Sequence, residues 1–238
     1  MFMIKLMKIN HVIFSGGGSG GHVIPAITLI KKLQSQGFSI SYIGSKNGIE
    51  KKLISELHLP YYAIATGKLR RYFSVQNFID PFKIIFGMIQ AFSMLLPLKK
   101  DQTLVFSTGG FVSVPVVVAA RLLGFKVFIH EQTSRVGLAN KIAGKFASKV
   151  FVSFEASKQF FESSKVMLSG YPVRDECYDA KIRVKVIAGV SIADIKKPIL
   201  FVTGGGNGSL LLNEAVSKEI VELKRKYFVF HQVGAQFV

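Results

Sequence analysis

The chain has 238 residues, of which 49% are hydrophobic and 19% charged, and its formal net charge is +17. This composition provides enough apolar material for a sizeable core and excludes disorder, while a single cysteine, Cys177, excludes a disulfide framework and fits a reducing compartment. The positive charge indicates an anionic partner: nucleic acid, an acidic membrane face or a phosphorylated substrate.

Short β-branched runs alternate with longer amphipathic runs, a pattern that predicts an α/β fold with a parallel sheet flanked by helices. The predicted strands are Lys8–Phe14, Ser39–Ile43, Thr103–Ser107, Lys126–His130, Lys149–Ser153 and Val166–Ser169. The predicted helices are Ile24–Gln36, Lys51–His58, Pro81–Leu96, Pro115–Leu123, Leu138–Ala147 and Glu155–Glu162. The longest apolar stretch, Ile84–Leu98, is too short to span a bilayer comfortably.

From residue 171 to residue 197 the pattern weakens into a polar stretch of mixed charge, which predicts a linker between domains 1–170 and 198–238. The predicted elements of the second domain are the strand Ile199–Thr203, a glycine loop, the helix Leu210–Lys226 and the strand Tyr227–Gln232. A strand, a helix and a strand cannot cover both faces of a parallel sheet. We therefore expect the second domain to be incomplete in this sequence.

A glycine-rich loop opens each predicted domain. The first glycine loop (Gly16–His22) joins a strand to a helix N-terminus, where bare backbone can approach a phosphate and free N–H groups can bind it. A tight turn that simply needs glycine is the alternative. The second glycine loop (Gly204–Gly208) repeats this arrangement, so the two loops are expected to face each other across a cleft that holds two substrates, one with a diphosphate.

The first glycine loop also matches two other motifs by spacing. Gly16-x-Gly18-x-x-Gly21 fits the dinucleotide fingerprint, but the second strand ends at Gly44-Ser45-Lys46 without an acidic residue for a ribose. Gly17-x-Ser19-x-Gly21 fits a hydrolase nucleophile elbow, which needs an Asp and a His further along the chain. No Lys-Ser or Lys-Thr pair closes the loop, which excludes a nucleotide triphosphate P-loop.

Several segments carry a more specific pattern when they are taken together. They are Gly17–Pro25, Tyr42–Lys46, Ile49–Glu50, Gly67–Phe73, Gly109–Pro115, His130–Gln132, Gly170–Arg174 and the second glycine loop before Asn213-Glu214. In this order they resemble the MurG family of N-acetylglucosaminyltransferases, which convert lipid I to lipid II in peptidoglycan synthesis. The resemblance covers almost the whole chain.

The resemblance implies a GT-B fold, with a complete N-terminal Rossmann-like domain for the acceptor and the membrane, and the beginning of a second Rossmann-like domain for the donor nucleotide. It implies an inverting transfer of N-acetylglucosamine from UDP-N-acetylglucosamine to an undecaprenyl-linked acceptor, at the cytoplasmic face of the bacterial membrane. No cofactor and no metal are expected, and the chain has no Asp-x-Asp pair. Because further donor-binding residues of the family lie beyond Val238, we expect little or no activity from the isolated chain.

The resemblance also assigns roles to individual residues. His22 is the candidate general base, since a helix N-terminus favours the neutral imidazole; alternatively it only lines the turn. Glu131 is a second catalytic candidate, which orients the acceptor or His22, and a buried structural carboxylate is the alternative. The donor-binding candidates are Ser19, Gly20, Gly21, Thr133, Arg174 and Gly206.

Aromatic and basic residues gather after residue 67, where an apolar patch ringed by cations can enter lipid headgroups and attract an anionic membrane surface. The candidates for membrane or acceptor contact are Arg70, Arg71, Phe73, Phe78 and Phe82. The loop between Phe73 and Phe78 is favoured. The spacing of Phe82, Ile85, Phe86 and Ile89 is also that of a core stripe, so we expect some of these four side chains in the core.

Two rival functions are considered. Nucleic-acid binding is not expected, because the sequence has no helix-turn-helix, zinc or RNP pattern. The second rival is an acceptor-side binding subunit of a split glycosyltransferase, without catalysis of its own. The linker and the second glycine loop favour the single-chain enzyme, because a split between subunits would fall more naturally at the linker.

Overall fold

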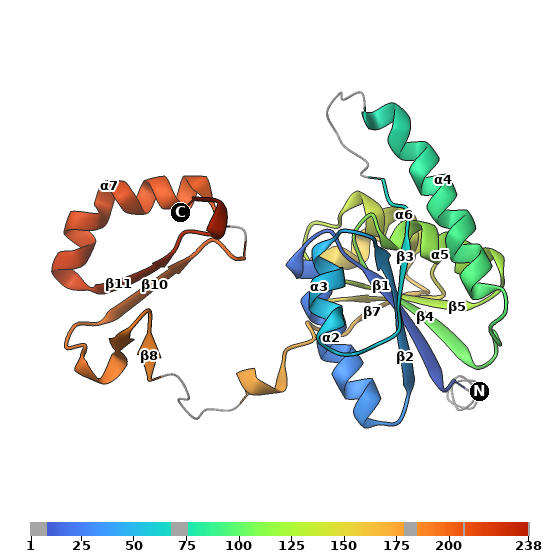
Figure 1. The fold of residues 1–238 in the computed structure, drawn as a ribbon, viewed down its shortest axis with the longest axis horizontal. Coiled ribbons are helices and arrows are strands. Elements are labelled where there is room, and N and C mark those ends of the chain that lie inside the picture. The colour runs from blue at the N-terminus through green and yellow to red at the C-terminus, as the bar shows by residue number, and fades with distance from the viewer. Residues whose placement is uncertain (1–8, 68–75, 179–184, 207, 238) are drawn as a thin grey trace. The chain divides into compact units, whose positions relative to one another are not determined.

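The chain divides into two compact units, Met1–Arg174 and Asp175–Val238. The computed structural model describes residues 9–67, 76–178, 185–206 and 208–237 (Figure 1). Each unit is described by itself below.

Within its described residues, the first unit is built on a seven-stranded parallel sheet of order β3-β2-β1-β4-β5-β6-β7. The strands are β1 (His11–Gly16), β2 (Ser39–Ser45), β3 (Tyr61–Ile64), β4 (Thr103–Gly109), β5 (Lys126–Glu131), β6 (Lys149–Val152) and β7 (Val166–Leu168). The chain runs outward from β1 to β3 and then returns to place β4 on the other side of β1. This reversal is the topological switch point, where open parallel sheets bind ligands.

Helices cover both faces of this sheet (Figure 1). They are α2 (Gly20–Ser35), α3 (Ile49–Ser55), α4 (Gln76–Leu95), α5 (Ser113–Leu122) and α6 (Leu138–Phe146), followed by the 3-10 helix η1 (Glu155–Phe160). Successive strand residues face opposite sides, so Val12 and Phe14 of β1 pack with α2 and α3, while Ile13 packs with α4, α5 and α6. Because both faces are buried, the strands are nearly continuous apolar runs in the sequence.

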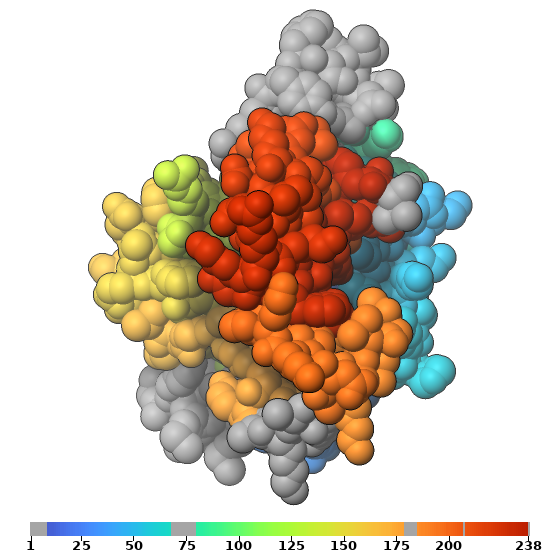
Figure 2. Space-filling model, turned by 90° about the vertical axis from the view of Figure 1, so that its left-hand side faces the viewer, coloured from blue at the N-terminus to red at the C-terminus, as the bar shows by residue number. Residues whose placement is uncertain are grey.

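The second unit is smaller. Its described elements are η2 (Asp175–Cys177), β8 (Val186–Ile187), β9 (Val190–Ser191), η3 (Ile192–Asp194), β10 (Ile199–Thr203), α7 (Leu210–Lys226), β11 (Phe228–Gln232) and η4 (Ala235–Phe237). Strands β10 and β11 pair in parallel through α7, and β8 and β9 form an antiparallel hairpin. In the space-filling view the hairpin segment (orange) and the α7–β11 segment (red) form one continuous surface (Figure 2). Among its described hydrophobic residues only Val216 and Phe230 are buried.

The predicted α/β fold is confirmed, and three local differences have physical reasons. Strand β3 was not predicted, because it is a four-residue edge strand that directly follows Pro60. The helix predicted at Glu155–Glu162 is instead the 3-10 helix η1, a shorter and tighter element. The stretch predicted as a linker, 171–197, contains the β8–β9 hairpin, whose two-residue strands are too short to give a period-2 signal.

Candidate active site

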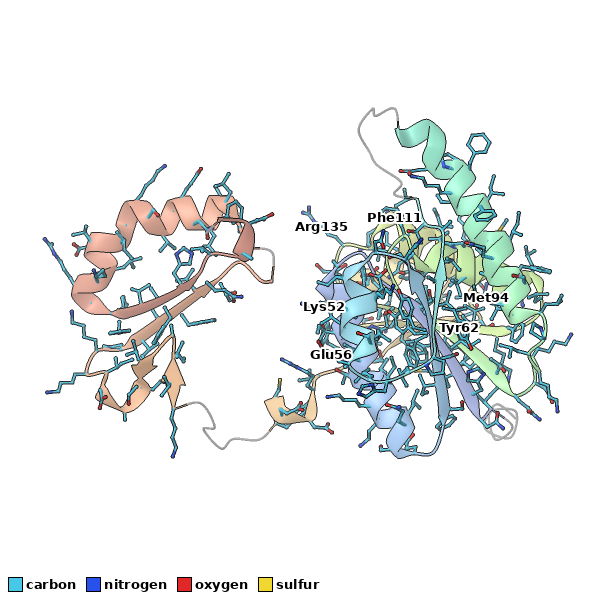
Figure 3. All side chains as sticks on the ribbon, in the orientation of Figure 1. Lys52, Glu56, Tyr62, Met94, Phe111 and Arg135 are labelled. Carbon is cyan, nitrogen blue, oxygen red and sulfur yellow. The ribbon has the colours of Figure 1, made fainter. Side chains whose placement is uncertain are left out.

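A cavity of about 1030 Å³ lies at the carboxyl ends of β1, β4 and β5 in the first unit. The first glycine loop, the end of β2 and the loops after β4 and β5 surround it. Phe111 and Arg135, from the latter two loops, lie at the same edge of the sheet (Figure 3). Lys46, Lys83 and Arg135 contribute positive charge to its lining, and Lys83 is already paired with Asp80 at 3.6 Å. The cavity therefore occupies the switch point and can attract an anionic ligand.

His22 projects from the first turn of α2 into the lining of this cavity. Its Nδ1 lies 3.0 Å from the Thr108 carbonyl oxygen and 3.3 Å from Oε1 of Gln132. Because a carbonyl oxygen only accepts hydrogen bonds, Nδ1 carries the proton, and Nε2 of the neutral imidazole keeps a lone pair that can accept one. Gln132 is itself fixed, since its Nε2 donates to the Thr108 carbonyl at 2.8 Å.

Glu131 also lines the cavity and is buried, but its bonds go to other residues than His22. Its Oε1 accepts from the Thr133 backbone N–H at 2.9 Å and from the Thr133 hydroxyl at 2.7 Å. Its Oε2 accepts from Nδ2 of Asn140 at 2.9 Å. Among the described side chains, Gln132 rather than Glu131 is therefore the hydrogen-bond partner of His22, and Glu131 holds the loop after β5 against α6.

Two glycines at the end of β4, Gly109 and Gly110, allow the segments around the cavity to approach each other closely. A Cβ at Gly110, whose φ is +83°, would lie 2.1 Å from the Gly17 carbonyl oxygen. A Cβ at Gly109 would lie 3.0 Å from Nδ1 of His22 and 2.8 Å from Nδ2 of Asn140. No side chain fits between these backbones, so glycine is required for the close approach of the β4 loop to the first glycine loop.

The donor-binding candidates fall into three groups. Ser19, which is the N-cap of α2, and Thr133 line the cavity, while Gly20 and Gly21 begin α2 beside it. Arg174 is exposed at the end of the first unit, outside the lining of the cavity. Gly206 follows β10 in the second unit.

The membrane candidates are only partly described. Arg70, Arg71, Phe73 and the side chain of Phe78 lie outside the described residues. Phe82 is 73% exposed on α4, whose first turns project beyond the rest of the unit (Figure 1).

The expectation that some of Phe82, Ile85, Phe86 and Ile89 join the core is wrong, because all four are at least 50% exposed. Ala91 and Leu95, on another face of α4, pack on the sheet instead. Among the described residues, no helix has the length and apolar character needed to cross a membrane.

Three further residues of this region were missed as site residues. Gln132 and Glu50 had a signal, since both belong to segments that carry the family resemblance, His130–Gln132 and Ile49–Glu50. Asn140 is a buried polar residue inside α6, and its Oδ1 has no partner among the described atoms. Glu50 is buried next to the first glycine loop. The contacts of Gln132 with His22 and of Glu50 with Gly18 span 110 and 32 residues, so spacing alone could not reveal them.

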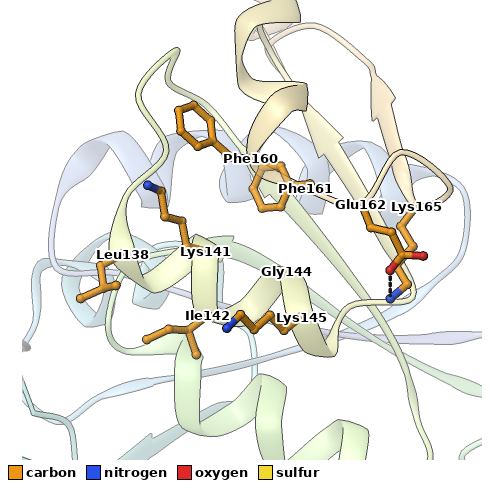
Figure 4. A pocket seen from close by; sticks show the side chains of 9 residues that line it. All are labelled: Leu138, Lys141, Ile142, Gly144, Lys145, Phe160, Phe161, Glu162 and Lys165. Atoms are coloured by element: carbon orange, nitrogen blue, oxygen red, sulfur yellow. Dashed lines mark ion pairs between the residues drawn. The ribbon is translucent and has the colours of Figure 1, made fainter.

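A second hollow, of about 670 Å³, lies beside α6 and is lined by residues such as Lys141, Phe160 and Lys165 (Figure 4). Two of the three lysines that line it are engaged in local contacts: Nζ of Lys141 lies 4.6 Å from the centre of the Phe160 ring, and Lys165 pairs with Glu162 at 2.7 Å.

Comparison with known proteins places this geometry in a family. The glycosyltransferase family 28 N-terminal domain matches residues 12–152. The "UDP-N-acetylglucosamine--N-acetylmuramyl-(pentapeptide) pyrophosphoryl-undecaprenol N-acetylglucosamine transferase 2" of Bacillus cereus is 45% identical over 95% of this chain and 63% of its own length. The transferase of the same description from Clostridium novyi, without the final number, is 41% identical over 96% of the chain and 63% of its own length. The crystal structure of Acinetobacter baumannii MurG matches with a TM-score of 0.66 and 28% identity, over 96% of this chain and 60% of that one.

A Rossmann-like unit with its cavity at the switch point, followed by a second strand–glycine loop–helix unit, defines the GT-B class of fold. The chain belongs to glycosyltransferase family 28. The resemblance to the MurG family is confirmed by the relatives, and the chain spans 63% of the length of the curated relatives it matches.

Proposed function

We propose that this chain belongs to an enzyme that transfers N-acetylglucosamine from UDP-N-acetylglucosamine to an undecaprenyl-diphosphate-linked muramoyl peptide. Residues 1–170 form the acceptor and membrane domain in this proposal, and residues 198–238 belong to the donor-nucleotide domain. The observation that carries it is the set of contacts of His22, which lines a cavity with cationic residues. Its Nδ1 donates to the Thr108 carbonyl and to Oε1 of Gln132, so Nε2 is the ring nitrogen that can accept a proton.

The proposed mechanism is an inverting displacement. The acceptor hydroxyl oxygen forms a bond to the anomeric carbon, the bond from that carbon to the diphosphate breaks, and UDP leaves with the electron pair. His22 Nε2 takes the hydroxyl proton as general base. Ser19 and the free N–H groups at the start of α2 contact the donor and stabilise the leaving diphosphate without metal. Glu131 fixes Thr133, a donor-contact candidate, in place.

The test is transfer of labelled N-acetylglucosamine to lipid I, measured with this chain and with the product of the complete reading frame that encodes it. His22→Ala should lower kcat of the active form by about 100-fold to 10,000-fold, the usual contribution of a general base. The matched control is His58→Asn, a change at an exposed histidine of the same unit. Full activity of His22→Ala would contradict the role of His22. Tight binding of lipid I without any transfer by either form would indicate the acceptor-side subunit of a split enzyme.

We also propose that the exposed stripe of α4 contacts an anionic membrane surface, which would make the protein peripheral to the membrane. Phe82, Ile85, Phe86 and Ile89 follow helical spacing and are exposed together. The test is co-sedimentation with vesicles that contain phosphatidylglycerol. The double change Phe82→Ser with Phe86→Ser should weaken binding at least tenfold. Leu211→Ser, at a residue 79% exposed on α7, serves as the control and should leave binding unchanged.

A further inference from the structure

Glu50 is a buried carboxylate that the proposed mechanism does not use. It lies in the first turn of α3, and its side chain is fully buried. Its Oε2 accepts the Gly18 backbone N–H at 3.1 Å, and its Oε1 accepts the Ser45 backbone N–H at 3.1 Å as well as the Ser45 hydroxyl. A single carboxylate therefore ties the first glycine loop to the end of β2.

The chain keeps space free for this carboxylate. A Cβ at Gly17 would lie 2.5 Å from Cδ of Glu50, and a Cβ at Gly48 would lie 2.2 Å from its Oε1. Both distances are too short for any side chain. The neighbouring carboxylate is thus sufficient to explain why both positions are glycine.

Two tyrosines complete the same network from the carbonyl side. The Tyr42 hydroxyl donates to the Gly16 carbonyl at 2.8 Å, and the Tyr61 hydroxyl donates to the Ser45 carbonyl at 2.6 Å. Burial, and secondly the negative charge of Glu50, raise the pKa of both tyrosines, so both hydroxyls stay protonated donors. Side chains of β2, β3 and α3 therefore bind backbone groups of the first glycine loop and of Ser45, the last residue of β2.

We propose that Glu50 is a positioning residue, which holds the first glycine loop in the conformation that presents Ser19 and His22 to the cavity. This inference rests on the proposed function of that cavity. The Gly18 N–H is directed to the carboxylate, and the N–H groups of Gly17 and His22 donate to the Gly109 and Ser19 carbonyls. Of the described residues 17–22, Ser19, Gly20 and Gly21 thus keep N–H groups for an anion. The anion site predicted from the sequence is therefore confined to the start of α2.

The substitution Glu50→Gln tests this role, because the amide has one acceptor oxygen and one donor group. It cannot accept from Gly18 and Ser45 at the same time, since its NH₂ would meet an N–H. The matched control is Glu56→Gln: Glu56 lies just after the end of α3 and points to solvent (Figure 3). Two quantities are measured on the full chain: the hydrogen-exchange rates of the Gly18 and Ser45 amides by NMR, and the affinity for a water-soluble short-chain lipid I analogue.

We expect Glu50→Gln to speed exchange of both amides at least tenfold and to weaken binding of the analogue at least tenfold, while Glu56→Gln matches the wild type. Unchanged exchange overturns the proposal, and faster exchange with unchanged affinity does so as well, because Glu50 would then be a purely structural acid. If the wild type does not bind the analogue, the proposed function fails, and the exchange rates alone decide whether Glu50 holds the loop.

If Glu50→Gln does not fold, a second variant, Ser45→Ala, tests the same proposal. Ser45→Ala keeps the charge and removes only the hydroxyl donor to Oε1. It should speed exchange of the Ser45 amide about threefold and weaken analogue binding by a similar factor. Wild-type values for both quantities in a folded Ser45→Ala protein would overturn the proposal.

Discussion

The two glycine loops begin alike, with a strand before them and a helix after them, but their surroundings differ. The first is held by Glu50 and by the β4 loop, 32 or more residues away in sequence. In the second, the Gly205 N–H donates to the Thr203 hydroxyl oxygen, and that hydroxyl donates to Gln232. The same local pattern thus contacts a buried carboxylate in the first unit and the end of the neighbouring strand β11 in the second.

The largest expected effect separates two glycines by steric fit: Gly110, which contacts the first glycine loop, and Gly205 of the second. Gly110→Ala should destabilise the first unit by roughly 2–5 kcal/mol, because backbone strain of about 1–2 kcal/mol adds to overpacking of about 1–3 kcal/mol against the Gly17 carbonyl. Gly205→Ala, at φ +73° with open space around the Cβ, should cost only about 1–2 kcal/mol. Urea unfolding followed by circular dichroism measures both. Equal losses would remove the steric distinction between these two glycines.

A second pair compares the cores of the two units. Val117 is fully buried on α5, whereas Val216 on α7 is 8% exposed in a unit with few buried residues. Val117→Ala should cost about 2 kcal/mol, from two lost methyl groups and the cavity they leave. Val216→Ala should cost about 1 kcal/mol, because a thin core relaxes more easily. Denaturant unfolding with a probe in each unit gives the two values, and a larger loss at Val216 would contradict this comparison.

The N-cap serines of α2 and α7 are expected to differ in what they contribute, and the effect on stability is smaller than the two above. The Ser209 hydroxyl oxygen accepts the Leu212 N–H at 3.4 Å and caps α7, whereas the Ser19 side chain makes no capping bond to the described backbone of α2. Ser209→Ala should therefore destabilise its unit by about 1 kcal/mol. Ser19→Ala should leave stability nearly unchanged and instead weaken UDP-N-acetylglucosamine binding in calorimetric titration. If Ser19→Ala lost as much stability as Ser209→Ala, the Ser19 hydroxyl would have a structural role, which contradicts this prediction.

The smallest expected effect is a pH dependence that belongs to the first unit. Burial lowers the pKa of His130 below its usual 6.5, against the opposing effects of its bond to the Gly170 carbonyl and of nearby Glu131. The folded state therefore favours neutral His130, and this stability is present above pH 6.5 and is lost as the pH falls through the folded pKa. Melting temperatures between pH 7.5 and 5 should fall less steeply in His130→Asn. Burial also lowers the pKa of His11, so His11→Asn should flatten part of the same slope. Parallel slopes in wild type and His130→Asn would exclude this contribution.

Much of the fold could be predicted from the sequence, because each long element has a local signal. The strand Ile199–Thr203 and the helix Leu210–Lys226 were predicted with the bounds they have in the structure. The exposed stripe of α4 was misjudged because helical spacing is the same for a stripe that faces the core and for one that faces solvent.

The candidate site could be predicted only in part. His22 and Ser19 stand in a recognisable loop, and the structure places both at the cavity. The contacts that orient them come from Thr108, Gln132 and Glu50. Their identities were visible in the sequence, but their pairing depends on strand order and on which loops meet at the switch point, and no local pattern encodes that.

The strand order of the first unit also has a consequence for how the protein reaches its native state. Strand β1 pairs with β4, so its second neighbour is synthesised some ninety residues after it. The contact of His22 with Gln132 closes a span of 110 residues. Contacts of such high sequence separation form late and slowly, because the chain entropy of the long loop is lost before the contact is gained. The contacts of the cavity with the β4 and β5 loops are accordingly expected to form late, and a nascent chain that has passed only α4 contains the first glycine loop with Glu50 but without Thr108, Gly109 and Gln132.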